Sequence, residues 1–135
     1  MTIMPSNVLV IDDNELTRSL LLLILRGAKY NVVGSAENVA RGLAMAKSLR
    51  PDIILLDNHM PDGDGVDCIK TLRRELPKSI ILMITTNSDQ GVIDKAMANG
   101  ANGFVIKPFN TQSVLGTIDK VNQQFVLANP AAPTF

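Results

Sequence analysis

Four ionisable side chains lie at the ends of short apolar runs of the chain, and together they could bind a metal ion and a phosphoryl group: Asp12, Asp13, Asp57 and Lys107. Carboxylates packed together repel one another strongly where the dielectric constant is low. They stay ionised only if positive charge lies among them. Lys107 supplies one such charge, and a hard divalent cation is expected to supply the rest.

Magnesium is the cation that fits this set best. It takes oxygen ligands at about 2.0–2.1 Å, keeps several waters, and prefers one or two carboxylates together with a phosphate. The chain has one histidine and one cysteine, Cys68, which is too few for a dedicated zinc site or an intrachain disulfide. A magnesium ion among carboxylates suits phosphoryl transfer, because it neutralises the phosphoryl oxygens.

Each of these residues also has an ordinary structural explanation. Asp13 or Asn14 could simply cap the following helix, and Thr85 could satisfy backbone groups at the end of a strand. Lys107 alone would be a solvated surface lysine. What favours a functional site is that these residues coincide, each at the carboxyl end of a predicted strand.

Five short runs rich in β-branched residues alternate with five stretches of helical pattern. Continuous apolar runs predict strands buried on both faces, hence a parallel sheet covered by helices. The more polar run at 31–35 is expected at an edge. This alternation predicts an α/β doubly wound fold with right-handed crossovers, in which ligands bind at the carboxyl ends of the strands. The predicted strands lie at 8–11, 31–35, 53–56, 80–84 and 104–106, and the helices at 14–28, 38–49, 66–76, 89–99 and 111–125.

The composition predicts one soluble intracellular domain. The chain has 135 residues, and its 13 basic and 13 acidic residues balance, so no basic field attracts nucleic acid or an anionic membrane. No apolar run approaches the roughly 20 residues of a membrane span, and no signal peptide is recognisable. We expect an N-terminal extension at 1–6, the folded domain at 7–126, a tail or linker root at 127–135, and a cytoplasmic location.

Four motifs resemble those of response-regulator receiver domains, the CheY-like phosphoacceptor modules of two-component signalling. They are VLVIDDNE, DIILLDNHMPDGDG, ILMITTNSD and GANGFVIKPF. The resemblance extends from Asn7 to Phe125, nearly the whole chain. It implies a flavodoxin-like (βα)5 sandwich whose five parallel strands take the order 2-1-3-4-5.

The resemblance also implies a role for each matching residue. Asp57 would accept a phosphoryl group as an acyl phosphate, Lys107 would pair with that group, and the Lys107–Pro108 bond would be cis. Thr85 would be the switch hydroxyl, and Phe104 the aromatic side chain that changes rotamer. The magnesium ligands implied are Asp12, acting through a metal-bound water, Asp13, Asp57 and the backbone carbonyl of His59; Mn²⁺ is expected to substitute for Mg²⁺.

Some residues depart from the family pattern or add to it. Thr86 stands where alanine or glycine is usual and could crowd the mouth of the site. The side chains of His59, Thr86 and Asn87 are expected to tune the lifetime of the acyl phosphate, although an exposed loop histidine is the simpler explanation of His59. In the first helix Leu22 is expected to be exposed and to dock a histidine-bearing donor, with Arg18 at the rim.

Four alternatives remain to be weighed. A flavodoxin would need a hydroxyl-rich phosphate loop after the first strand, and a dinucleotide-binding domain would need a glycine-rich one; neither is present there. A haloacid-dehalogenase-like phosphatase would need a D-x-D motif, whereas Asp12 and Asp13 are adjacent. A receiver-like module that works without phosphorylation stays open.

The partners implied by the resemblance are a histidine kinase or a histidine phosphotransfer protein on the input side. On the output side we expect an unknown downstream protein or a C-terminal effector domain missing from this chain. Phosphorylation would switch the face formed by the fourth helix, fifth strand and fifth helix. The chain itself would be a signalling switch rather than an enzyme, with no direct binding to nucleic acid or membrane.

Overall fold

The computed structural model describes residues 6–86 and 89–128, with the backbone alone for 125–128. Five parallel strands form the main sheet in the spatial order β2-β1-β3-β6-β7. Counting only these five, the order is 2-1-3-4-5, so the predicted fold and strand order are confirmed. The strands are β1 (Asn7–Ile11), β2 (Asn31–Ala36), β3 (Ile53–Asp57), β6 (Ile80–Thr86) and β7 (Gly103–Lys107).

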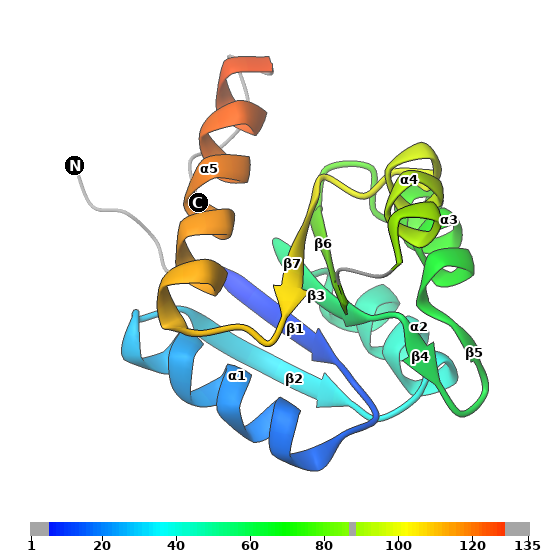
Figure 1. Cartoon of the computed structure of the whole chain (residues 1–135), viewed down its shortest axis with the longest axis horizontal. Coiled ribbons are helices and arrows are strands. Elements are labelled where there is room, and N and C mark those ends of the chain that lie inside the picture. The colour runs from blue at the N-terminus through cyan, green and yellow to red at the C-terminus, as the bar shows by residue number, and fades with distance from the viewer. Residues whose placement is uncertain (1–5, 87–88, 129–135) are drawn as a thin grey trace.

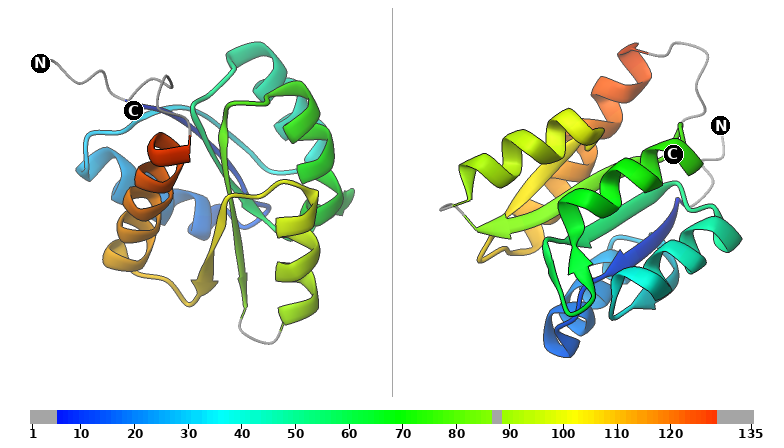
Figure 2. Two further views of the ribbon diagram at one scale, coloured as in Figure 1. Left: turned by 90° about the horizontal axis from the view of Figure 1, so that it is seen from above. Right: turned by 90° about the vertical axis from the view of Figure 1, so that its right-hand side faces the viewer.

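Five helices cover the two faces of this sheet. Figures 1 and 2 show α1 and α5 together on one face, with α2, α3 and α4 on the other. The Asn14 side chain caps α1 by accepting a hydrogen bond from the Thr17 N–H, and Gly100 ends α4 in the left-handed conformation. The helices are α1 (Glu15–Gly27), α2 (Val39–Leu49), α3 (Gly65–Glu75), α4 (Gln90–Asn99) and α5 (Thr111–Ala128).

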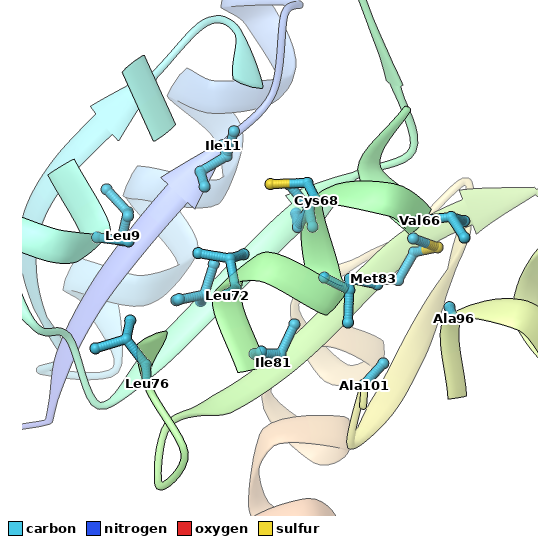
Figure 3. Close-up of a cluster of buried hydrophobic side chains, with 14 of the residues drawn as sticks. Leu9, Ile11, Val66, Cys68, Leu72, Leu76, Ile81, Met83, Ala96 and Ala101 are labelled. Atoms are coloured by element: carbon cyan, nitrogen blue, oxygen red, sulfur yellow. The ribbon is translucent and has the colours of Figure 1, made fainter. Parts of the chain in front are cut away.

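Alternation along the strands divides the apolar core into two layers. In β1, Leu9 and Ile11 pack toward α2 and α3, whereas Val8 and Val10 pack toward α1 and α5. Figure 3 shows the first layer, where the strand side chains meet Leu72 and its neighbours from α3. Both faces of the central strands are therefore buried, which is why their sequences are continuously apolar.

A two-stranded antiparallel ladder, β4 (His59–Met60) with β5 (Gly63–Asp64), follows β3 and was not predicted. At its turn, both carboxylate oxygens of Asp62 accept hydrogen bonds from the backbone N–H groups of Val39 and Ala40, at 2.8 and 3.0 Å. These bonds hold the pKa of the Asp62 carboxyl below its usual value. The ladder is thereby joined to the first turn of α2.

The exposure predicted for Leu22 is wrong. Leu22 is partly buried and packs against the core layer beneath α1 and α5, because the buried face of α1 consists of Leu21, Ile24 and Leu25. The exposed leucines lie on the opposite side, at i, i+4 and i+7: Leu16 (80% exposed), Leu20 (46%) and Leu23 (71%). They form one apolar stripe, which we call the α1 leucine stripe.

The amino edge of the sheet is held by one arginine. The guanidinium of Arg73, in α3, donates to the backbone carbonyls of Leu76, Pro77, Ser79 and Gly100 and to the side chain of Asn102. It thus joins the end of α3 to the loop between α4 and β7. None of the helices in the described part of the chain combines the length and apolarity needed to cross a membrane.

Candidate functional site

The sheet register brings the predicted residues to one edge. Ile11 pairs with Leu56, so Asp12 and Asp57 come next on neighbouring strands. Asp57 pairs with Ile84, which places Thr85 just beyond it on β6, and Lys107 ends β7 beside Thr86. In Figure 1 the arrowheads of β1, β2 and β7 point toward this edge.

An ion pair stands at the centre of the site. The Lys107 Nζ donates to the Asp57 Oδ1 at 2.7 Å, and the Asp57 side chain is only 5% exposed. A buried carboxylate without a partner would be costly, and the Lys107 ammonium group offsets the charge of Asp57. The peptide bond that follows, Lys107–Pro108, is cis.

Asp12 is the most deeply buried acid of the group, at 1% exposure. Its Oδ1 accepts from the Asn14 N–H at 2.8 Å, while its Oδ2 has no hydrogen-bond partner among the residues that the structure describes. Burial raises the pKa of Asp12, and the charges of Asp57 and Asp13 raise it further. The hydrogen bond from the Asn14 N–H and the charge of Lys107 lower this pKa in part. Within the described part of the chain, one buried carboxylate oxygen is therefore available to a ligand.

These acids fit a hard divalent cation. Asp12, Asp13 and Asp57 each offer a carboxylate oxygen, and the three oxygens lie within 4.8 Å of one another. Asp13 is exposed, so the cluster opens to solvent on one side. A cation here would pair the orphaned Asp12 oxygen and offset the mutual repulsion of the carboxylates.

The other predicted residues surround this cluster. Thr85 is buried at 3% exposure, and its hydroxyl lies 3.4 Å from the Asp89 Oδ2. Thr86 is exposed and donates to the same oxygen at 2.9 Å. The Phe104 side chain is 39% exposed on β7, and His59 is exposed on β4. Asn87 lies outside the described residues.

Arg18, which was expected at the rim of a docking surface, contacts the site itself. Its Nη1 donates to the backbone carbonyl of Asp12 at 2.7 Å, so its guanidinium is attached to the end of β1. The partly buried Leu22 lies one helical turn further along α1. The predicted pair of docking residues is thus divided between the site and the core.

Two residues beside Asp57 were missed by the sequence reasoning. Gly65 begins α3, and its N–H donates to the Asn58 carbonyl at 2.7 Å. A Cβ at Gly65 would lie 2.3 Å from the Asp57 carbonyl oxygen. Asn58 is 4% exposed, and its Oδ1 has no partner among the described residues. The glycine in the motif DGDG was a signal for the first, and the signal for the second was a polar residue where the family pattern is more often apolar.

Comparison with known proteins agrees with this geometry. The family model described as response regulator receiver domain matches residues 8–119. The chemotaxis protein CheY of Thermotoga maritima is 32% identical over 120 residues, which cover 89% of this chain and 100% of that protein. CheY-like proteins of similar length are therefore relatives of this chain along nearly its whole length.

Two solved structures are similar in fold and sequence. CheY4 of Vibrio cholerae superposes with a TM-score of 0.80 at 32% identity, covering 87% of this chain and 99% of that one. CheY in the CheX–CheY–BeF3–Mg²⁺ complex of Borrelia burgdorferi gives 0.83 at 26% identity, covering 87% and 90%. From its fold, its acidic site and these matches, the chain belongs to the response regulator receiver domain family of two-component systems.

Proposed function

We propose that Asp57 is the phosphoacceptor of this receiver domain and that the donor is the phosphohistidine of a histidine kinase or a histidine phosphotransfer protein. A carboxylate oxygen of Asp57 forms a bond to phosphorus, the phosphorus–nitrogen bond breaks, and the imidazole leaves with that electron pair. The observation that carries this proposal is the buried Asp57 paired with Lys107 at 2.7 Å beside two further carboxylates.

Lys107 serves two states in this proposal. Before transfer, its ammonium group offsets the charge of the buried Asp57 carboxylate. After transfer, the same group pairs with the phosphoryl oxygens, which carry about −1.5 to −2 charges at neutral pH. Removing the lysine is therefore expected to impair the link between phosphorylation and β7 while leaving the metal-binding oxygens in place.

Mg²⁺ is the proposed cofactor, with Mn²⁺ as a substitute. Asp12, Asp13, Asp57 and the backbone carbonyl of His59 would hold it, and the orphaned oxygen of Asp12 supports this choice. When bound, the cation neutralises charge on the phosphoryl oxygens. The similar CheY of B. burgdorferi was solved with BeF3 and Mg²⁺.

The output is proposed to be a change of the face formed by α4, β7 and α5. Thr85 would turn toward the phosphoryl group, and the half-exposed Phe104 would change rotamer, so that a local charge event biases a distant surface. The face would then bind a downstream protein or a C-terminal effector domain in the cytoplasm. The chain acts as a switch that catalyses only its own phosphotransfer and slow self-dephosphorylation.

The α1 leucine stripe replaces Leu22 as the proposed docking surface for the donor. The stripe begins at Leu16, three residues after Asp13, so a helical bundle that presents histidine to Asp57 would lie against it. Leu23→Asp is expected to slow phosphotransfer from the donor protein at least tenfold and to leave labelling by acetyl phosphate unchanged. Equal rates from the protein donor would exclude this surface.

The decisive experiment is labelling by acetyl phosphate with Mg²⁺, followed by intact-protein mass spectrometry. One phosphoryl group is expected, and Asp57→Asn should remove it because an amide cannot form the acyl phosphate. Asp52→Asn is the matched control, since Asp52 lies at the amino edge of the sheet, where its Oδ2 accepts from the Asn7 N–H. Unchanged labelling of Asp57→Asn would refute the assignment.

The tuning roles proposed for His59 and Thr86 are tested by the decay of that label. If His59 acts on the acyl phosphate, the decay rate changes between pH 6 and 8, and His59→Ala abolishes that change. Thr86→Ala accelerates both labelling and decay if Thr86 obstructs the site. Rates that match those of the unaltered chain would remove both residues from the proposal.

A further inference from the structure

The carboxylate of Asp89 bonds to the end of β6 rather than to the helix that it precedes. Asp89 occupies the N-cap position of α4, yet its side chain makes no capping hydrogen bond there. An aspartate at this position ordinarily accepts from an N–H of the first turn, which stabilises a helix by about 1 kcal/mol. Here one oxygen, Oδ2, accepts from the hydroxyls of both Thr86 and Thr85.

The two hydroxyl bonds differ in strength. The Thr86 Oγ1 lies 2.9 Å from the Asp89 Oδ2, an ordinary length, whereas the Thr85 Oγ1 lies 3.4 Å away, longer than the usual range of about 2.5–3.0 Å. Thr86 therefore anchors the carboxylate at the strand end. Thr85 is held only weakly, so its hydroxyl can leave for a stronger acceptor.

A hydroxyl has one proton to donate. Thr85 is buried and follows Ile84, the residue that pairs with Asp57 across the sheet. Its proton can go to Asp89 or to a phosphoryl oxygen on Asp57, but not to both at once. The bond to Asp89 therefore forms only in the unphosphorylated chain. Its free energy stabilises that state against the one in which Thr85 bonds to the phosphoryl group.

We propose that Asp89 is a positioning residue, which holds the Thr85 hydroxyl away from Asp57 until Asp57 is phosphorylated. The hydroxyl then leaves Asp89 and bonds to the phosphoryl group. The proposal rests on the proposed function, in which Asp57 is the phosphoacceptor and Thr85 the switch hydroxyl. It also gives Thr86 a role: its hydroxyl keeps the Asp89 carboxylate at the strand end. Once Thr85 leaves, that carboxylate keeps the hydrogen bond from the Thr86 hydroxyl.

The test measures binding of beryllofluoride with Mg²⁺, a phosphoryl analogue, by amide chemical shifts in NMR. Asp89→Ala is expected to bind it about fivefold more tightly, since a charge-assisted bond present only in the free chain has been removed. Asp94→Ala removes the same charge from the exposed side of α4 and is expected to bind like the unaltered chain. Asp89→Asn keeps an acceptor oxygen and should restore most of the original affinity.

A double-mutant comparison separates positioning from charge. In the Thr85→Val background the hydroxyl is gone, so adding Asp89→Ala should leave the affinity unchanged. A fivefold gain in that background, or no gain in the unaltered chain, would overturn the proposal. If the unaltered chain bound no beryllofluoride, the proposed function itself would fail; binding with no effect of Asp89→Ala would refute only the role of Asp89.

Discussion

Gly65→Ala is expected to destabilise the chain and to displace the backbone of Asp57. The new Cβ would lie 2.3 Å from the Asp57 carbonyl oxygen, whereas ordinary van der Waals contact begins near 3.4 Å. One of the two segments must therefore move by about 1 Å, and both are backbone, because Gly65 begins α3 and Asp57 ends β3. Neither can yield as a flexible side chain would.

The cost follows from this displacement. Overpacking a rigid core costs about 1–3 kcal/mol, and a backbone-to-backbone contact belongs at the upper end of that range. For a domain of this size each kcal/mol lowers the melting temperature by about 4 °C, so a fall of roughly 8–12 °C is expected. Labelling of Asp57 should slow more than tenfold even well below the melting temperature, since a shift of about 1 Å can cost 100-fold.

Differential scanning calorimetry and acetyl phosphate labelling measure the two effects. Gly116→Ala is the control: Gly116 is exposed within α5 and a Cβ there meets nothing within 4 Å, so alanine should stabilise the helix by about 0.5–1 kcal/mol. A Gly65→Ala chain that melted within about 2 °C of the original and was labelled at the same rate would refute the close contact.

Three further predictions concern stability and reactivity. Asn58→Leu removes a buried oxygen that has no partner in the described chain and should raise stability by about 1 kcal/mol in urea unfolding; a loss would mean that the amide is satisfied. Arg73→Met removes the bonds to four backbone carbonyls and should cost about 2–4 kcal/mol. Arg73→Lys should recover only part of this, because lysine has three donors; full recovery would show that charge alone matters. The Cys68 thiol is buried, which together with the charge of Asp62 raises its pKa to about 12, so iodoacetamide should modify it only after unfolding. Rapid modification of the folded chain would contradict that burial.

The sequence was most informative where burial acts on both faces of a strand. Continuous apolar runs located the central strands of the main sheet, and the polar residues after them located Asp12, Asp57 and Lys107. The ladder of β4 and β5 was missed because each strand has two residues, and its stability comes from Asp62 and α2 rather than from its own sequence.

The error in α1 has a physical cause. Six consecutive apolar residues, Leu20 to Leu25, allow several helical stripes, and only packing against β1 and α5 selects one of them. Contacts across short loops, such as Asp89 with Thr85 or Gly65 with the Asp57 carbonyl, depend on the loop path, which the apolar and polar pattern of the sequence does not encode.

The order of the strands along the chain also determines when, during synthesis, the residues of the site are all present. Its acids come from β1 and β3, but Lys107 ends β7, the last strand to be synthesised. Until that strand pairs with β6, a nascent chain would hold Asp12, Asp13 and Asp57 together without their lysine. In that state the mutual repulsion of the three carboxylates would not be offset by Lys107. Pairing of the edge strand β7 with β6 thus completes the sheet and its charge balance in one step.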